Sequence, residues 1–209
     1  MTNDAKFHVA RHSERELYDR SAINQLLDNQ YVAHVGFIDQ DNQEPFVIPM
    51  GFARDNDRIL LHGSTGSRLM RQIAQGIDLC VTVTQLNAIV VARSAFNSSM
   101  NYESVMIFGI ARVLEDSEKD LALERITEKL VPGLWNYGRP LASKEIAATL
   151  IVELSLDKVS AKSREGDPSD DEEDLALPIW AGLLPIESKV GKPITAANSA
   201  AIAVPPHIA

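Results

Sequence analysis

Between residues 31 and 115 one short strand-like segment follows another, with only one short helical pattern between them. The segments are rich in β-branched and aromatic residues, and turn compositions such as DQDNQE and RDND separate them. They are YVAHVGFI (31–38), PFVIPMGFA (45–53), RILLH (58–62), DLCVTVTQL (78–86), AIVVARSAF (88–96), ESVMIFGIARVLE (103–115) and, later, ATLIVELSLDKVSAK (148–162). Because no regular strand–helix alternation is present to build a parallel sheet, this succession predicts a mainly β fold with flanking helices, arranged as a closed or nearly closed antiparallel barrel.

Helical patterns are few and lie mostly at the margins of this series. Ser13 and Glu16 have the spacing of a capping box, and Ser117 with Asp120 marks a second helix start. The expected helices are 14–29, 67–74 and 118–130. The helices are therefore expected to flank the β structure rather than to form a layer of their own.

Length and charge limit the classes of protein that this chain can belong to. Its 209 residues suit one domain, expected over 1–192, followed by an Ala-rich, proline-broken and weakly ordered tail over 193–209. A formal charge of −9 disfavours nucleic acid and anionic membranes as partners. No signal peptide or membrane span is recognisable, and the single cysteine, Cys80, allows no intramolecular disulfide. We therefore expect a cytoplasmic protein.

A run of seven acidic residues lies between 165 and 174, mixed with glycine and proline. Mutual repulsion of the carboxylates predicts an extended, hydrated loop that gains nothing from burial. Its spacing lacks the glycine and terminal glutamate of a calcium-binding loop. The five histidines show no metal-ligand spacing either, and we propose no metal site.

The segment LHGSTGSRLMRQ (61–72) is the strongest local indication of a binding site. A predicted strand enters a glycine- and hydroxyl-rich loop and then a helix start, an arrangement that suits an anion. The candidate groups are Gly63, Ser64, Thr65, Gly66, Ser67 and Arg68, with His62 at the strand end as a candidate for proton handling. A plain helix cap by Ser67 and a structural His62 are the alternatives. The spacing excludes a nucleoside triphosphate loop.

A second polar segment, ARSAFNSSMNYESV (92–105), interrupts two predicted strands. Polar loops in compact barrels often carry function, although a hydrated surface turn would have the same composition. No nucleophile elbow, cysteine–histidine pair or paired carboxylates accompany it, so hydrolase chemistry has little support.

Several of these segments together resemble a known family. They are YVAHVGF with PFVIPMGF, then LHGSTGSRL, CVTVT, VARSAF with MNYESVMIFGIARV, and VSAKSREGDPSDDEEDLALPIWAGLLP, covering roughly residues 11–186. In this order they are similar to the pyridoxamine 5'-phosphate oxidase-like superfamily of FMN-binding split barrels, in particular to its small flavin-nucleotide-binding branch related to nitroimidazole-resistance proteins. The resemblance implies a six-stranded antiparallel split β-barrel that forms a homodimer with FMN in clefts at the subunit interface.

By motif position the resemblance also implies the residues that contact the cofactor. The isoalloxazine ring would lie along Pro49, Met50, Gly51 and Phe52; His62, Gly63 and Ser64 would flank the ribityl chain; Ser67 and Arg68 would hold the phosphate; Ser104 would hydrogen-bond the ring; and Lys162 and Trp180 would close the cleft.

Departures from the family pattern bear on the substrate. Asn97, Ser98 and Glu103 stand where related sequences commonly carry histidines and an arginine, and the groups that pyridoxamine phosphate oxidases use to hold their substrate are not recognisable. Two functional classes follow: an FMN-dependent oxidoreductase acting on an unidentified small molecule, or a non-catalytic flavin carrier or sensor. A related split barrel that uses haem or a deazaflavin is the third possibility.

Overall fold

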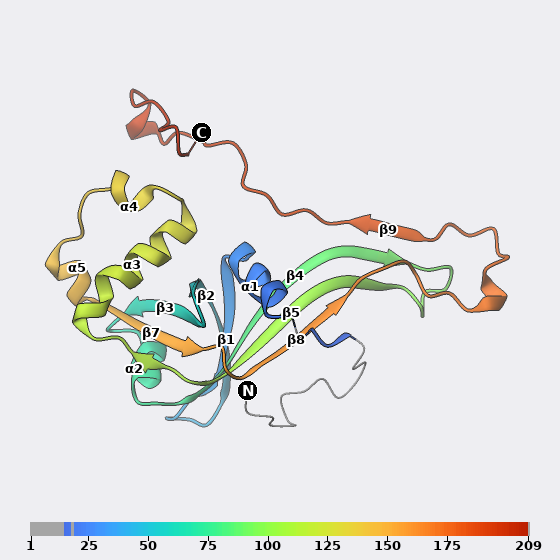
Figure 1. The fold of residues 1–209 in the computed structure, drawn as a ribbon, viewed down its shortest axis with the longest axis horizontal. Coiled ribbons are helices and arrows are strands. Elements are labelled where there is room, and N and C mark those ends of the chain that lie inside the picture. The colour runs from blue at the N-terminus through green and yellow to red at the C-terminus, as the bar shows by residue number, and fades with distance from the viewer. Residues whose placement is uncertain (1–14, 18, 209) are drawn as a thin grey trace.

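The computed structural model describes residues 15–17 and 19–208, and β-strands dominate it (Figure 1). The helices are α1 (Arg20–Asn29), α2 (Arg68–Ala74), α3 (Asp116–Leu130), α4 (Leu134–Tyr137) and α5 (Ser143–Ala147), with two 3₁₀ turns at Glu172–Asp174 and Ala197–Ser199. The strands are β1 (Val32–Ile38), β2 (Pro45–Asp55), β3 (Arg58–Ser64), β4 (Asp78–Val91), β5 (Ser99–Ile110), β6 (Arg112–Val113), β7 (Thr149–Ser155), β8 (Val159–Arg164) and β9 (Gly182–Pro185).

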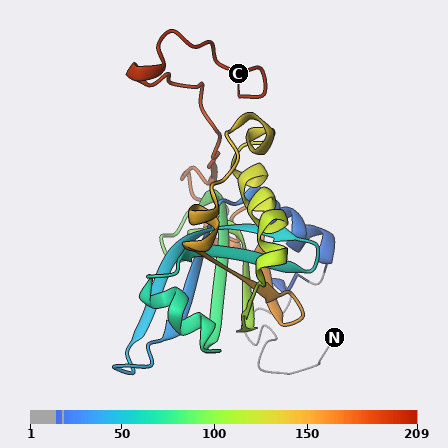
Figure 2. The same ribbon diagram turned by 90° about the vertical axis from the view of Figure 1, so that its left-hand side faces the viewer.

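These strands form one antiparallel sheet in the order β6-β7-β3-β2-β1-β4-β5-β8, with β9 added beside β4. Strand β2 changes partner along its length: residues 45–51 pair with β1, and residues 52–55 pair with β3. The sheet therefore consists of two parts joined through β2, and it curls around its own interior (Figures 1 and 2). This confirms the mainly β, antiparallel prediction.

The strand count differs from the six that were expected, because nine strands lie in the described part of the chain. The segment predicted as one strand over 148–162 is two strands, β7 and β8, separated by a turn in which Leu156 N donates to Asp57 O. Conversely, the segment predicted at 78–86 and the first part of the segment predicted at 88–96 join into the single strand β4, which ends at Val91. A register shift between Leu86 and Ala88 accommodates one extra residue in it.

The helix starts differ from the predicted caps at two of three positions. Helix α1 begins at Arg20 with Asp19 as its N-cap, while Ser13 lies outside the described residues. Helix α3 begins at Asp116, because the carboxylate of Glu118 accepts from the backbone N–H of Glu115 and so fixes the start ahead of Ser117. Helix α2 begins at Arg68, and Ser67 is its N-cap, which was the alternative to an anion contact: Ser67 Oγ accepts from Met70 N at 3.5 Å.

Two hydrophobic clusters stabilise this arrangement. The larger fills the interior of the curled sheet, where fully buried Ile59, Leu61 and Ile107 meet residues of α1 and α2. The smaller lies between α3 and the outer side of β3 and β7, and Leu60 and Ile151 are at its centre. Each fully buried aliphatic side chain of this size contributes roughly 1.5–3 kcal/mol, so the interior cluster carries most of the fold's stability.

The acidic segment 165–174 is more closely held than its composition predicted. Asp170 leaves only 2% of its side chain exposed and accepts hydrogen bonds from the backbone N–H and the guanidinium of Arg93. The prediction that this loop is entirely hydrated is therefore wrong at Asp170, because a buried carboxylate is tolerated when a cation and a backbone N–H satisfy it.

After β9 the chain leaves the sheet and returns toward α4 (Figure 1). His207 lies edge-on against the ring of Tyr137, with ring centroids 5.1 Å apart. In the described part of the chain no helix is long and apolar enough to cross a membrane.

Candidate functional site

The loop between β3 and α2 is shaped by its own hydrogen bonds. Thr65 N donates to Ala148 O at 3.0 Å, Ser67 N to Ser64 O at 2.9 Å, and Gly66 N to Ser64 Oγ at 3.2 Å. These bonds fix the backbone before any ligand arrives, and the hydroxyls of Ser64 and Thr65 remain in an exposed position. The loop is therefore a preformed polar surface at the end of β3.

The two glycines of this loop serve different purposes. A Cβ at Gly63 would lie 2.7 Å from Cγ of Met70, whose side chain is buried in the interior cluster. A Cβ at Gly66 would meet only Ser64 Oγ, at 3.6 Å. Gly63 is thus required for packing under the loop, whereas Gly66 leaves open space above it.

His62 lies where β3 separates from β2 but is still paired with β7. Its strand partner on one side is Ile151 of β7, but on the other side the pairing of β3 with β2 ends one residue earlier, at Leu61 and Phe52. Its Nδ1 atom is buried and has no hydrogen-bond partner among the described residues. Burial lowers the pKa of His62, so the imidazole is neutral at pH 7 and can donate or accept a hydrogen bond.

Arg68 holds a buried carboxylate that the sequence did not single out. Its Nε lies 2.6 Å from Asp39 Oδ2, its Nη2 bonds the same oxygen, and Gln72 Nε2 donates to that oxygen at 2.9 Å. The guanidinium also lies over the ring of Phe46, 5.2 Å from its centroid. About half of the Arg68 side chain stays exposed, at 50%. The guanidinium is therefore fixed in place but still reachable from solvent.

Asp39 itself is fully buried at the turn after β1. Burial alone raises the pKa of this carboxyl, but hydrogen bonds from Arg68, Gln72 and the backbone N–H groups of Asn42 and Asp41 outweigh it and keep the pKa below its ordinary value. The sequence placed Asp39 in a turn composition, DQDNQE, where a structural carboxylate cannot be distinguished from a solvated one.

The strand segment predicted to lie along a flavin ring spans the point where β2 changes partner. Pro49 and Gly51 are exposed, Met50 is partly buried, and Phe52 is buried in the interior cluster. Gly51 pairs with Val32, and Phe52 pairs with Leu61 next to His62. The structure thus brings this segment beside His62 and the β3–α2 loop.

The remaining predicted contacts lie elsewhere in the sheet. Ser104 of β5 is directly opposite Lys162 of β8, so these two are neighbours. Strands β2, β1 and β4 separate them from β3 in the sheet order. Trp180 is 63% exposed and folds over Gly182, which pairs with Val91 at the far end of β4. Within one chain, strand pairing does not bring Ser104, Lys162 or Trp180 next to the β3–α2 loop.

Residues that depart from the family pattern are engaged in local contacts. Asn97 Nδ2 lies 3.4 Å from Asp171 Oδ2, and Ser98 Oγ accepts from Ala92 N at 3.1 Å. Glu103 lies in β5 opposite Ser163. The polar segment therefore packs against the acidic loop.

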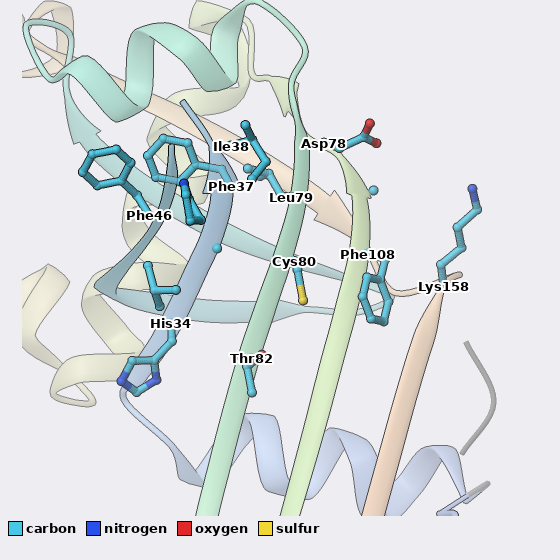
Figure 3. Close-up of a pocket in the computed structure, with 14 residues that line it drawn as sticks. His34, Phe37, Ile38, Phe46, Asp78, Leu79, Cys80, Thr82, Phe108 and Lys158 are labelled. Carbon is cyan, nitrogen blue, oxygen red and sulfur yellow. The ribbon is translucent and has the colours of Figure 1, made fainter. Parts of the chain in front are cut away.

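A groove on the outer face of the sheet was not predicted (Figure 3). It has a volume of about 650 Å³, and its floor is one row across four strands, in which Val47, Gly36, Cys80 and Phe108 stand opposite one another. A Cβ at Gly36 would come within 3.1 Å of Cys80 O, so glycine keeps the floor low. His34 stands at its edge.

Acidic, histidine and cysteine side chains do not gather in groups of three that could hold a metal ion anywhere in the described residues.

Comparisons with known proteins agree with this architecture. The chain is 38% identical to a protein whose structure is described as the flavocytochrome Anf3 from Azotobacter vinelandii, over 98% of this chain and 95% of that one, with a TM-score of 0.91. It is 37% identical to an FAD and haem binding protein from Mycobacterium smegmatis, over 93% of this chain and 95% of that one, with a TM-score of 0.89.

A candidate 5-nitroimidazole antibiotic resistance protein from Bacteroides thetaiotaomicron shares the fold, with a TM-score of 0.60 and 20% identity over 70% of this chain and 85% of that one. Comparison with curated proteins gave no significant match. The sequence profile described as pyridoxamine 5'-phosphate oxidase matches residues 19–163. This match and the two relatives above show that the chain belongs to the pyridoxamine 5'-phosphate oxidase-like family.

Proposed function

We propose that this protein binds a flavin nucleotide where β2 and β3 part, and that it acts as an oxidoreductase on a small molecule. One observation carries the proposal: the buried Nδ1 of His62 has no partner at the point where the sheet divides, and the hydroxyl-rich loop follows it directly. A buried polar atom without a partner is costly unless a ligand or water satisfies it. A flavin carries both the polar ring edge and the phosphate that these two features suit.

Each residue near the point where β2 and β3 separate would have a specific role in flavin binding. The exposed backbone at Pro49 and Gly51 would flank the ring, His62 would hydrogen-bond the ring or the ribityl chain, and Ser64 and Ser67 would contact the phosphate. Arg68 would offer the part of its guanidinium that Asp39 leaves free. The bound flavin supplies the electron transfer itself, so no side chain need act as a covalent nucleophile.

FMN is the flavin predicted from the sequence, and the relative named for FAD makes FAD the direct competitor. The two share the ring, the ribityl chain and the first phosphate, which are the parts that the loop would hold. A titration of flavin fluorescence with riboflavin, FMN and FAD separates them. Tighter binding of FMN than of riboflavin supports a phosphate site; no binding of any flavin overturns the proposal.

A second candidate function is that of a two-cofactor protein holding haem as well. Two relatives are named a flavocytochrome and an FAD and haem binding protein. In this chain most residues that line the outer groove are apolar, His34 stands at its edge, and imidazole is a common axial ligand of haem iron. The absorption spectrum of the purified protein distinguishes bound flavin from bound haem. Replacing His34 with Ala should remove only the haem spectrum if this site is correct.

A homodimer is also proposed, as the sequence led us to expect. The outer face of β1, β2, β4 and β5 leaves Val32, Val47 and Ile110 substantially exposed. An apolar face of this kind is typical of a surface that a partner covers. A second copy would also bring its own Ser104, Lys162 and Trp180 to the interface, where one chain alone does not join them to the β3–α2 loop. A mass near the 23.0 kDa monomer in light scattering would reject the dimer.

A further inference from the structure

The C-terminal arm, residues 186–208, is fixed at both ends and unsupported between them. At its start, Ile186 N donates to Asn87 O at 2.9 Å, next to the pairing of β9 with β4. At its end, His207 packs on Tyr137 and lies above Gly133, where a Cβ would come 3.1 Å from its ring. The arm therefore begins and ends on the same chain and spans the space between β4 and α4 (Figure 1).

Between these two anchors the arm makes no hydrogen bond to the rest of the described protein. The hydrogen bonds of residues 187–204 connect members of this segment with each other, as in Ile202 N to Ser199 O. Residues 187–198 are all exposed, and a Cβ added at Gly191 would touch nothing within 4 Å. Holding a backbone in one path costs roughly 1–2 kcal/mol per residue. No contact within the described chain offsets that cost over 187–198, whereas contacts with a second molecule would offset it.

The exposed apolar side chains of residues 187–198 favour an apolar surface as their neighbour. Val190 is 81% exposed and Ile194 is 97% exposed, and they lie four residues apart, which is two repeats of an extended chain. Two lysines and one glutamate give the arm a net positive charge, although the whole chain carries −9. A partner with an acidic surface and an apolar patch would complement both features.

We propose that the arm closes around a second copy of this chain. A second copy has the required negative charge, and the arm starts from β9, which extends the same sheet whose outer apolar face is the proposed dimer surface. The arm of each subunit would then pass over its partner, with Val190 and Ile194 buried against it. This inference rests on the proposed homodimer but assigns it a specific element.

The test compares dimer dissociation constants by analytical ultracentrifugation. The double variant Val190→Ser with Ile194→Ser should raise the constant about tenfold or more, because four apolar contacts are lost per dimer. Leu121→Ser is the matched control, since Leu121 is a half-exposed apolar residue on α3, away from the arm. It should leave the constant unchanged.

The outcomes separate the two proposals. If the wild type is a dimer and the double variant dissociates no more readily, the dimer stands and the role of the arm is overturned. If the wild type is monomeric at all concentrations, the dimer fails and the arm proposal fails with it.

A second measurement does not depend on substitutions. Trypsin can cut after Lys189, whereas Lys192 precedes a proline and resists cleavage. Cleavage at Lys189 should slow as the protein concentration rises through the dimer dissociation constant. A rate independent of concentration would overturn the proposal.

Discussion

The β3–α2 loop and the outer face of the sheet differ in how completely one chain builds them. The loop is held by its own backbone bonds, a buried carboxylate and a glycine fitted to Met70. The outer face leaves apolar residues exposed around a groove, and the C-terminal arm has no support between its anchors. The loop is therefore preformed in a single subunit, whereas the outer face leaves apolar surface in contact with solvent.

Replacing Arg68 with Ala should have the largest effect on ligand binding. Charge-assisted hydrogen bonds contribute roughly 1.5–3 kcal/mol, so FMN binding should weaken by about ten to a few hundred fold, while riboflavin, which lacks the phosphate, should be little affected. Fluorescence titration with both flavins measures this. Equal losses for both would mean that Arg68 serves only to neutralise Asp39.

The matching variant is Asp39→Asn, which removes the charge that Arg68 neutralises in the protein. It should leave FMN binding at least as tight as in the wild type, because the guanidinium loses a competitor for the phosphate. Weaker binding of FMN by Asp39→Asn would show that the carboxylate orients Arg68 rather than competing with the ligand.

Gly63→Ala should destabilise the fold, and Gly66→Ala should not. The new methyl at residue 63 would overlap the buried Met70 side chain, and overpacking of this kind costs roughly 1–3 kcal/mol. The methyl at residue 66 meets only ordinary contact. Urea denaturation of the two variants gives the comparison. Similar midpoints for both would mean that Met70 moves aside at no cost.

The sequence predicted the loop better than the outer face, for a physical reason. Ser67 caps α2 as its spacing indicated, because caps depend on neighbours a few residues away. The bond between Arg68 and Asp39 joins residues 29 apart in the chain and depends on how β1 meets α2. Likewise, the floor of the groove needs the register that places Gly36 opposite Cys80, which no local pattern specifies.

Stability should fall with acid in two separate pH ranges. Burial lowers the pKa of His62 below its ordinary 6.5, so the unfolded chain binds the proton more readily. The resulting stability is present above pH 6.5 and is lost as pH falls through the lower pKa of the folded protein. Asp39, whose pKa is held below 3.8, adds a second loss beginning below that pH.

Denaturant midpoints measured from pH 8 to pH 3 would resolve the two ranges. His62→Gln should remove the first loss and keep the second. Asp39→Asn should keep the first loss and reduce the second only in part, because the pKa values of Glu118, Glu128, Glu145 and Glu153 are lowered as well. A first loss that persists in His62→Gln would assign it to another histidine.

The smallest expected effect is that of Cys80→Ala, and its contrast with His62→Ala separates the two regions in a turnover assay. Cys80 lies on the floor of the outer groove, which His62 does not line, and a flavin needs no thiol nucleophile. Once an oxidisable substrate is identified, Cys80→Ala should keep nearly the full rate. His62→Ala should lower it, because proton handling or positioning beside the flavin is lost. The reverse result would move the reacting centre from the division of the sheet to the groove, and would make the outer face the site of chemistry rather than a surface for a partner.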